Sequence, residues 1–168
     1  MTLTIPPAGD YKIDPEESGI HFKSTHMFGL GSVTGTFALR SGHVSIASPL
    51  TASSAEAVAD ATSFSTGSDA RDKKVLSSAF LDPAAYPEIS FTSVSAVNAD
   101  GTWILRGTLT AHGVDAPVEF TVTDSGFVDG TLHLAATATV DRYAHGITAM
   151  KGMAGRYLHL TVTVQARQ

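Results

Sequence analysis

Polar and apolar residues alternate along most of the chain, which is typical of β-strands that bury one face. In residues 20–26, Ile20 and Phe22 fall on one side of an extended strand, and His21 and Lys23 fall on the other. Comparable alternation, rich in Thr, Val and Ile, occurs in residues 33–39, 57–64, 88–97, 103–110, 118–123, 132–140 and 157–165. The pattern predicts an all-β fold in which about eight short antiparallel strands form a barrel or sandwich.

One segment interrupts the alternation and has the spacing of a helix. Ser68 or Asp69 can cap its beginning, and Leu76 and Phe80 fall on one apolar face. The helix has to end before Pro83, because the residue ahead of a proline is disfavoured in the α region. A short helical insertion near residues 69–80 is therefore expected, docked on the strands through its apolar face.

Length, charge and composition limit the class of protein. A chain of 168 residues with a net charge of −5 fits one domain, expected at residues 11–168 behind a loose leader at 1–10. Nucleic-acid binding is not expected, since the chain has no basic stripe. Cysteine is absent, which excludes disulfides, thiol catalysis and cysteine-ligated zinc.

Targeting signals are also missing from the sequence. The first residues contain neither a basic region nor an apolar stretch of the kind found in secretion signals. No apolar run approaches the roughly 18 residues of a transmembrane helix. The expected location is the cytoplasm, or the periplasm or extracellular space if the sequence is that of an already processed chain.

Motifs that carry catalysis or bind metals are scarce. The seven histidines include no His-x-His pair, which would place two imidazoles on one face of a strand. No metal site and no cofactor are therefore expected, although histidines distant in sequence could still meet in the fold. His26 shares the face of Ile20 and Phe22 and has two interpretations: a hydrogen-bonded core histidine, or a polar group at the end of an apolar cavity.

Large apolar residues recur on the alternating segments along the whole chain. A barrel of about eight strands is either filled by its side chains or holds one small ligand. The strand lengths here suit the ligand-holding kind. Met150 and Met153 add adaptable side chains that could line an irregular pocket, or belong to a surface loop between strands.

Four segments together resemble the YceI-like family of lipid-binding proteins. They are YKIDPEESGIHFKSTHMFGLGSVTGTF at 11–37, TSFSTGSDARDKKVLSSAFLDPAAYPEISFTS at 62–93, GTLTAHGVDAPVEF at 107–120 and VDRYAHGI at 140–147. The resemblance implies a lipocalin-like antiparallel barrel with a short helical insertion, and often a homodimer. It also implies an interior tunnel for a long amphiphile such as a polyisoprenoid or an isoprenoid quinone. Many members carry a secretion signal, which this chain lacks.

The resulting hypothesis is a non-enzymatic protein that carries or stores such a lipid. Burial of ten methylene groups would contribute about 8 kcal/mol before the cost of association, so no strong head-group site is needed. The residues expected to contact the ligand are Phe22, His26, Phe37, Phe64, Leu76, Phe80, Phe91, Trp103, Leu109, Phe120, Met150 and Met153. Arg71, Arg142 and Lys151 are candidates to meet its polar head.

Two alternatives remain open at the level of the sequence. The first is an enzyme that acts on an isoprenoid or another lipid in the same cavity, with His26 or Asp72 as acid or base. The second is a filled barrel that acts only through contacts with other proteins.

Overall fold

In the computed structural model, which describes residues 3–26 and 29–168, ten strands form one antiparallel sheet. The strands are β1 (Gly9–Ile13), β2 (Gly19–His26), β3 (Gly31–Phe37), β4 (Leu39–Ile46), β5 (Ser54–Asp60), β6 (Glu88–Ala99), β7 (Thr102–Ala111), β8 (Val114–Val128), β9 (Thr131–Asp141) and β10 (Tyr157–Arg167). The helical elements are α1 (Asp69–Val75) and three 3₁₀ turns, η1 (Leu50–Ala52), η2 (Ala61–Ser63) and η3 (Arg142–His145).

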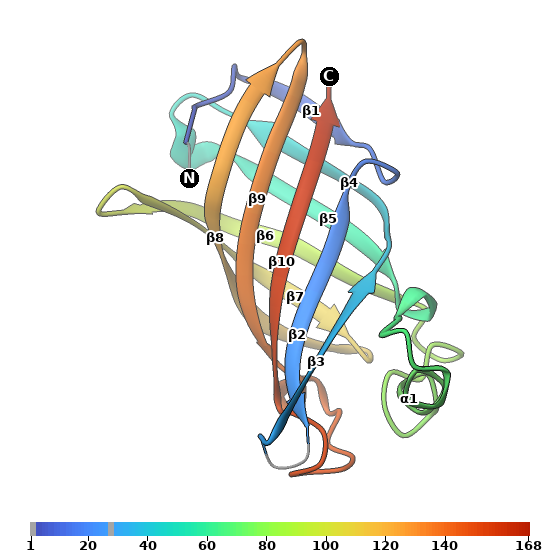
Figure 1. The fold of residues 1–168 in the computed structure, drawn as a ribbon. Coiled ribbons are helices and arrows are strands. Elements are labelled where there is room, and N and C mark those ends of the chain that lie inside the picture. The colour runs from blue at the N-terminus through green and yellow to red at the C-terminus, as the bar shows by residue number, and fades with distance from the viewer. Residues whose placement is uncertain (1–2, 27–28) are drawn as a thin grey trace.

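The sheet closes on itself through β1. This strand pairs with β4 along one edge and with β10 along the other, which completes a ring of eight strands, β1-β4-β5-β6-β7-β8-β9-β10. The β2–β3 hairpin continues the wall past β1 and β4, because β2 also pairs with β10. Figure 1 shows the result, a tall barrel with β1 near one end and α1 beside the other. The predicted antiparallel barrel of about eight strands is confirmed.

Short turns link the strands from β6 to β9. Two-residue connections join β6 to β7, β7 to β8 and β8 to β9, and both residues of each have positive φ. Such turns match the twist of the flanking strands and favour Gly at the second position. The sequences Asp100-Gly101, His112-Gly113 and Asp129-Gly130 meet this requirement.

The expected helix is present but shorter than residues 69–80. The Ser68 hydroxyl accepts a hydrogen bond from the Arg71 amide at the N-terminus of α1, as an N-cap does. At the other end, the amide and hydroxyl of Ser77 both donate to the carbonyl of Lys74. The Ser77 amide thus bonds three residues back rather than four, and the chain continues through turns.

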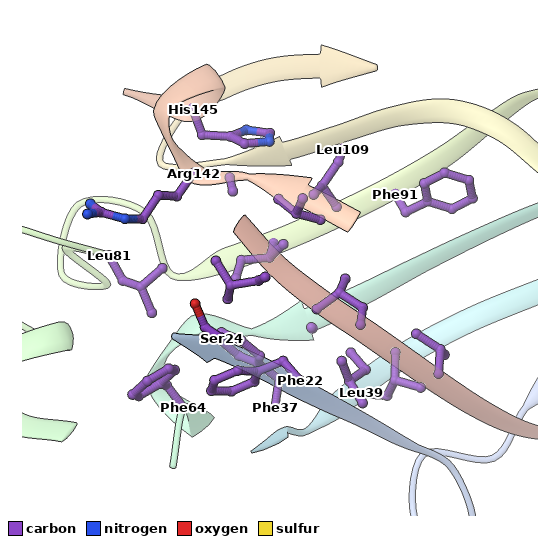
Figure 2. Close-up of a pocket in the computed structure, with 18 of the residues that line it drawn as sticks. Phe22, Ser24, Phe37, Leu39, Phe64, Leu81, Phe91, Leu109, Arg142 and His145 are labelled. Atoms are coloured by element: carbon purple, nitrogen blue, oxygen red, sulfur yellow. The ribbon is translucent and has the colours of Figure 1, made fainter. Parts of the chain in front are cut away.

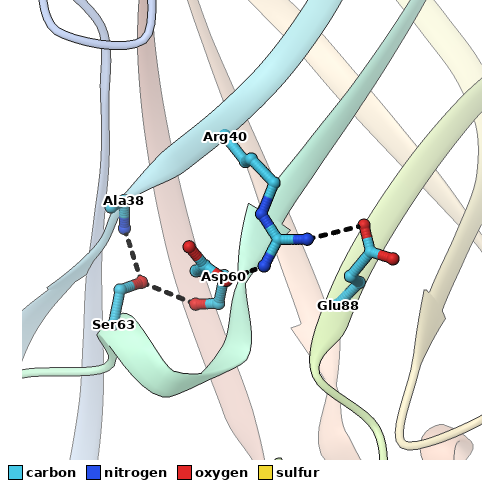
Figure 3. Close-up of polar contacts among 5 residues, drawn as sticks. All are labelled: Ala38, Arg40, Asp60, Ser63 and Glu88. Atoms are coloured by element: carbon cyan, nitrogen blue, oxygen red, sulfur yellow. Dashed lines mark hydrogen bonds and ion pairs between the residues drawn. The ribbon is translucent and has the colours of Figure 1, made fainter.

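A polar cluster fixes the corner between β4, β5 and β6 (Figure 3). The Arg40 guanidinium pairs with Asp60 and lies 3.0 Å from the carboxylate of Glu88. The Ser63 hydroxyl accepts from the Ala38 amide at 2.8 Å and donates to the Asp60 carbonyl. These bonds hold the turn η2 that leads the chain from the barrel wall into the segment containing α1.

The end of the barrel near β1 is closed by a compact core. Tyr11 and Leu132 are completely buried there, and they pack with Ile13, Leu39, Val44 and Ala166. The Tyr11 hydroxyl donates to the Pro7 carbonyl, and the amide of Thr4 donates to Ser125. Within the segment predicted as a loose leader, these bonds attach the chain to the barrel, and β1 already begins at Gly9.

Gly107 permits a close approach between β6 and β7, which predicts a specific sensitivity. A methyl group added there would collide with the Thr92 carbonyl oxygen and lie 2.6 Å from the Phe91 ring. Because backbone cannot yield as a flexible side chain does, Gly107→Ala should lower the free energy of unfolding by about 1–3 kcal/mol. Denaturant unfolding measures this loss.

Gly126 in β8 provides the matched control. An added methyl group there meets no atom within 4 Å, and alanine restricts the unfolded chain more than glycine does. Gly126→Ala should therefore unfold at the same denaturant concentration as the original protein, or slightly above it. Equal stability of the two variants would contradict the steric interpretation of Gly107.

Candidate functional site

The interior of the barrel contains an elongated cavity of about 620 Å³ with an almost wholly apolar wall (Figure 2). This volume falls within the range of about 300–1,000 Å³ that is usual for small-molecule sites. Residues from all ten strands and from α1 contribute to the wall. A cavity of this size does not fit the alternative of a barrel filled by its own side chains.

Small and branched side chains on the inward faces of the strands leave this space open. On β10 the inward positions are Leu158, Leu160, Val162 and Val164, which alternate with outward-facing residues. Across the barrel, β5 contributes Ala55, Ala57 and Ala59 to the wall. Since the alanines reach only a short way into the lumen, the two facing walls do not meet.

An aromatic cluster lies towards the α1 end of the cavity. The ring centroids of Phe22, Phe37 and Phe64 lie 5.2–5.6 Å apart, and Phe80 and Leu81 join the same buried group. A second pair, Phe91 and Phe120, meets edge to face at 5.0 Å on the β6–β8 side. The strands thus bring together aromatic residues that are up to about a hundred positions apart in the sequence.

Most of the residues predicted to contact a ligand lie on the cavity wall. They are Phe22, Phe37, Phe64, Phe80, Phe91, Leu109, Phe120, Met150 and Met153, together with the head-group candidates Arg71 and Arg142. Leu76, Trp103 and Lys151 do not line it. Whether any of these residues binds a ligand stays a prediction.

The position of Trp103 has a structural reason. It has the same strand parity as Leu105 and Leu109, which face the cavity. However, β8 pairs with β7 only from Ile104 to Ala111, so Trp103 lies on the arm of the β6–β7 hairpin that projects beyond the barrel (Figure 1). Inward parity therefore does not bring it to the lumen.

The other predicted residues occupy distinct places. Leu76 caps the C-terminus of α1 and packs, partly buried, against the aromatic cluster. The Lys151 ammonium group lies 5.2 Å from the ring centre of Tyr143, in a cation–π arrangement. The backbone of His26 pairs with Gly31 at the end of β2, but its side chain lies outside the described residues.

Asp72, the proposed acid or base of the enzyme alternative, has neighbours that use its carboxylate. Its oxygens accept from the amide of Thr66 at 3.0 and 3.1 Å and from the hydroxyl of the same residue at 2.6 Å. These bonds tie α1 to the segment that follows η2. The arrangement is that of a structural carboxylate rather than one poised for proton transfer.

Arg142 is the most elaborately bonded polar residue on the wall. Its side chain is 6% exposed, and its three nitrogens donate to the carbonyls of Ile147, Ala154 and Gly155 at 2.8, 3.0 and 2.8 Å. Burial lowers the pKa of its guanidinium from the usual value, although an arginine stays charged at neutral pH. Arg142 therefore holds the loop 146–156 against the barrel.

The neighbouring ion pair supports the same loop from outside. The carboxylate of Asp141 accepts from Arg156 at 2.9 and 3.0 Å and from the amide of Tyr143 at the start of η3. The hydrogen bonds from Arg156 hold the pKa of Asp141 below its usual range. Asp141 is engaged by Arg156, and its negative charge also opposes the effect of burial on the pKa of Arg142.

His145 is a site residue that the sequence did not single out. It is 3% exposed and lies on the cavity wall, and its Nδ1 lies 2.9 Å from the Val114 carbonyl. The alanines of β5 were missed as well, because the sequence-based candidates were large apolar residues. Their alternation in Ala55, Ala57 and Ala59 is the signal that could have found them.

Within residues 3–26 and 29–168, no group of three or more His, Asp or Glu side chains is placed to hold a metal ion. None of the helices in this part of the chain has the length and hydropathy needed to cross a membrane.

Solved structures with the same fold cover nearly the whole chain. Burkholderia cenocepacia BcnA superimposes with a TM-score of 0.78 at 18% identity, over 91% of this chain and 98% of that one. A polyisoprenoid binding domain from Saccharophagus degradans gives 0.71 at 17% identity, over 94% and 97%. The Campylobacter jejuni YCEI protein gives 0.60 at 14% identity, over 100% and 89%.

Sequence relatives agree with this fold. A UPF0312 protein of Pseudomonas fluorescens (strain SBW25) is 38% identical over 125 residues, and one of Vibrio campbellii is 35% identical over 115. The matches span 64% and 60% of those relatives' own lengths, and 71% and 66% of this chain. Residues 11–167 match the model of the YceI-like domain, and the chain therefore belongs to the YceI-like domain family.

Proposed function

We propose that this protein binds one long isoprenoid lipid in its barrel cavity and holds it without chemical change. The observation that carries the proposal is the apolar cavity of about 620 Å³, which is lined by the barrel strands and bordered by charged side chains, among them Arg71 and Lys74. Such a space suits a hydrocarbon chain whose polar end lies beside those side chains.

The energy of transfer favours this kind of ligand. Each buried methylene contributes about 0.8 kcal/mol, so ten of them contribute about 8 kcal/mol before the cost of association. The aromatic cluster and the branched side chains of β10 offer an irregular wall suited to the methyl branches of an isoprenoid. The fold shared with a polyisoprenoid binding domain supports this choice among lipids.

We extend the proposal of lipid binding to a role in the cell. The protein would transport or store a polyisoprenoid or an isoprenoid quinone, as a homodimer, in the cytoplasm or, for a processed chain, outside it. Fractionation of cells that express the natural gene locates the protein, and native mass spectrometry reads the number of chains. A monomer at micromolar concentration would contradict the proposed dimer but not the lipid site.

Native mass spectrometry tests the binding itself. The protein is purified without detergent, stripped with mild organic solvent and incubated with an isoprenoid of about ten units. We expect one lipid per chain, recovered with unchanged mass after long incubation. A protein that stays lipid-free both as purified and after incubation would overturn the proposal, and a ligand of altered mass would favour the enzyme alternative.

A further inference from the structure

His145 presents one defined hydrogen-bonding atom to the cavity. Its Nδ1 lies 2.9 Å from the carbonyl oxygen of Val114, and a carbonyl can only accept, so Nδ1 carries the proton. In the neutral ring the other nitrogen, Nε2, then holds a lone pair and acts as an acceptor. The carbonyl of His145 is itself bonded to His112 Nδ1 at 3.2 Å, which helps to fix this turn.

Nε2 has no hydrogen-bond partner among the described residues, yet it is not sealed. No side-chain nitrogen or oxygen in the described part of the chain is both unpaired and inaccessible to a water-sized molecule. The residue is only 3% exposed and forms part of the cavity wall. Figure 2 shows the imidazole on the side of Leu109, across the cavity from Phe22 and Phe64.

An unpaired acceptor in an apolar cavity selects the chemistry of its partner. Leaving it dry costs free energy, and a ligand atom that only accepts, such as an ether, carbonyl or carboxylate oxygen, cannot relieve that cost. A hydroxyl group can donate to it. We infer that His145 Nε2 receives a hydrogen bond from a hydroxyl group of the bound lipid, which makes the preferred ligand a long-chain alcohol or another hydroxyl-bearing isoprenoid.

The place of His145 along the barrel agrees with a terminal hydroxyl. Leu132, the second residue of β9, belongs to the core that closes the β1 end, whereas His145 ends η3, four residues after the last residue of the same strand. A strand of 11 residues spans roughly 36 Å. The hydroxyl end of the lipid would thus lie near the loop 146–156, with the hydrocarbon chain directed towards Tyr11.

Two substitutions separate the roles of the two ring nitrogens. His145→Asn keeps a donor near the position of Nδ1, for the Val114 carbonyl, and removes the acceptor at Nε2. His145→Gln places an amide oxygen near Nε2 and gives up the bond to Val114. The probes are geranylgeraniol and its methyl ether, in which a methyl group replaces the hydroxyl proton, titrated calorimetrically at pH 8.

The inference rests on the proposed lipid binding and predicts a ratio of affinities. The original protein should bind the alcohol about three- to tenfold more tightly than the ether, as one neutral hydrogen bond implies. His145→Asn should bind both equally, and His145→Gln should keep a preference for the alcohol. A preference that survives in His145→Asn, or equal binding of both probes by the original protein, would overturn the role of His145 and leave lipid binding intact. Binding of neither probe would overturn the proposed function, and this inference with it.

Discussion

Replacement of Arg142 by methionine should lower the free energy of unfolding by about 2–4 kcal/mol and release the loop 146–156. The guanidinium donates to three backbone carbonyls of this loop. Hydrogen bonds to a charged group contribute more than neutral ones, and a buried acceptor left unpaired adds a further cost. Methionine can replace the apolar contacts of the arginine stem, but it replaces neither these bonds nor the cation–π contact of the guanidinium with Phe80.

Denaturant unfolding measures the loss, and hydrogen exchange of the loop amides shows where it occurs. Arg106→Met is the control, because Arg106 pairs with Glu119 on the outside of the barrel and both side chains are more than half exposed. Exposed pairs contribute at most about 1 kcal/mol. Equal stability of the two variants would show that the bonds of Arg142 to the loop are dispensable.

The same variant tests the sequence-based expectation that Arg142 meets a lipid head group. If the role of Arg142 were to bind an anionic head group, its replacement would lower the affinity for anionic lipids and leave the free energy of unfolding nearly unchanged. The observed bonds predict the opposite order: a large loss of stability, and a weaker hold on any lipid, charged or neutral, because the loop no longer covers the end of the cavity.

The barrel could be predicted from the sequence because its main determinants are local. Alternation marks the strands, and pairs such as Asp100-Gly101 mark the turns between them. Inward and outward faces were harder to assign, since β-bulges interrupt β4, β6 and β8. Phe120 and Phe127 lie on one strand with opposite parity, and yet Phe120 lines the cavity and Phe127 packs on Tyr11, because the bulge after Val122 reverses the alternation.

The cavity itself was only partly predictable. Its aromatic residues stand out in the sequence, and most of them lie on the wall. The open volume depends instead on the short side chains of the facing alanines on β5 and β9. No single residue of the sequence shows that these short side chains face one another. His145 gave no local signal either, because the hydrogen bond that orients its ring is made with the Val114 carbonyl. Val114 is distant in sequence and is positioned by the pairing of β7 and β8.

Ala136→Trp should weaken the binding of long isoprenoids by at least about a hundredfold while the protein stays folded. Ala136 lies on β9 between Val122 and Val162, and all three residues face the cavity. An indole at this position would occupy the middle of the lumen. A lipid that loses the burial of four methylene groups loses about 3 kcal/mol, which corresponds to more than a hundredfold in affinity.

Thr137→Trp is the matched control, because it adds the same side chain at the next position of the same strand. Thr137 pairs with Thr121 and Thr161, and these threonines line a shallow depression on the outer face of the barrel. Lipid affinity of this variant should equal that of the original protein. Should Ala136→Trp prove strained, Ala57→Leu on the facing wall narrows the same lumen with a smaller side chain.

Thermal unfolding completes the test, because it distinguishes a tryptophan that fills the cavity from one that overpacks the barrel. The indole should fill empty space and add apolar contacts, so the midpoint of lipid-free protein should stay level or rise, whereas overpacking would lower it. Stabilisation by added lipid should disappear, because a ligand stabilises only the state that binds it. If the filled barrel still bound isoprenoid with full affinity, the lipid would have to lie on the outer surface, and the cavity would no longer explain binding.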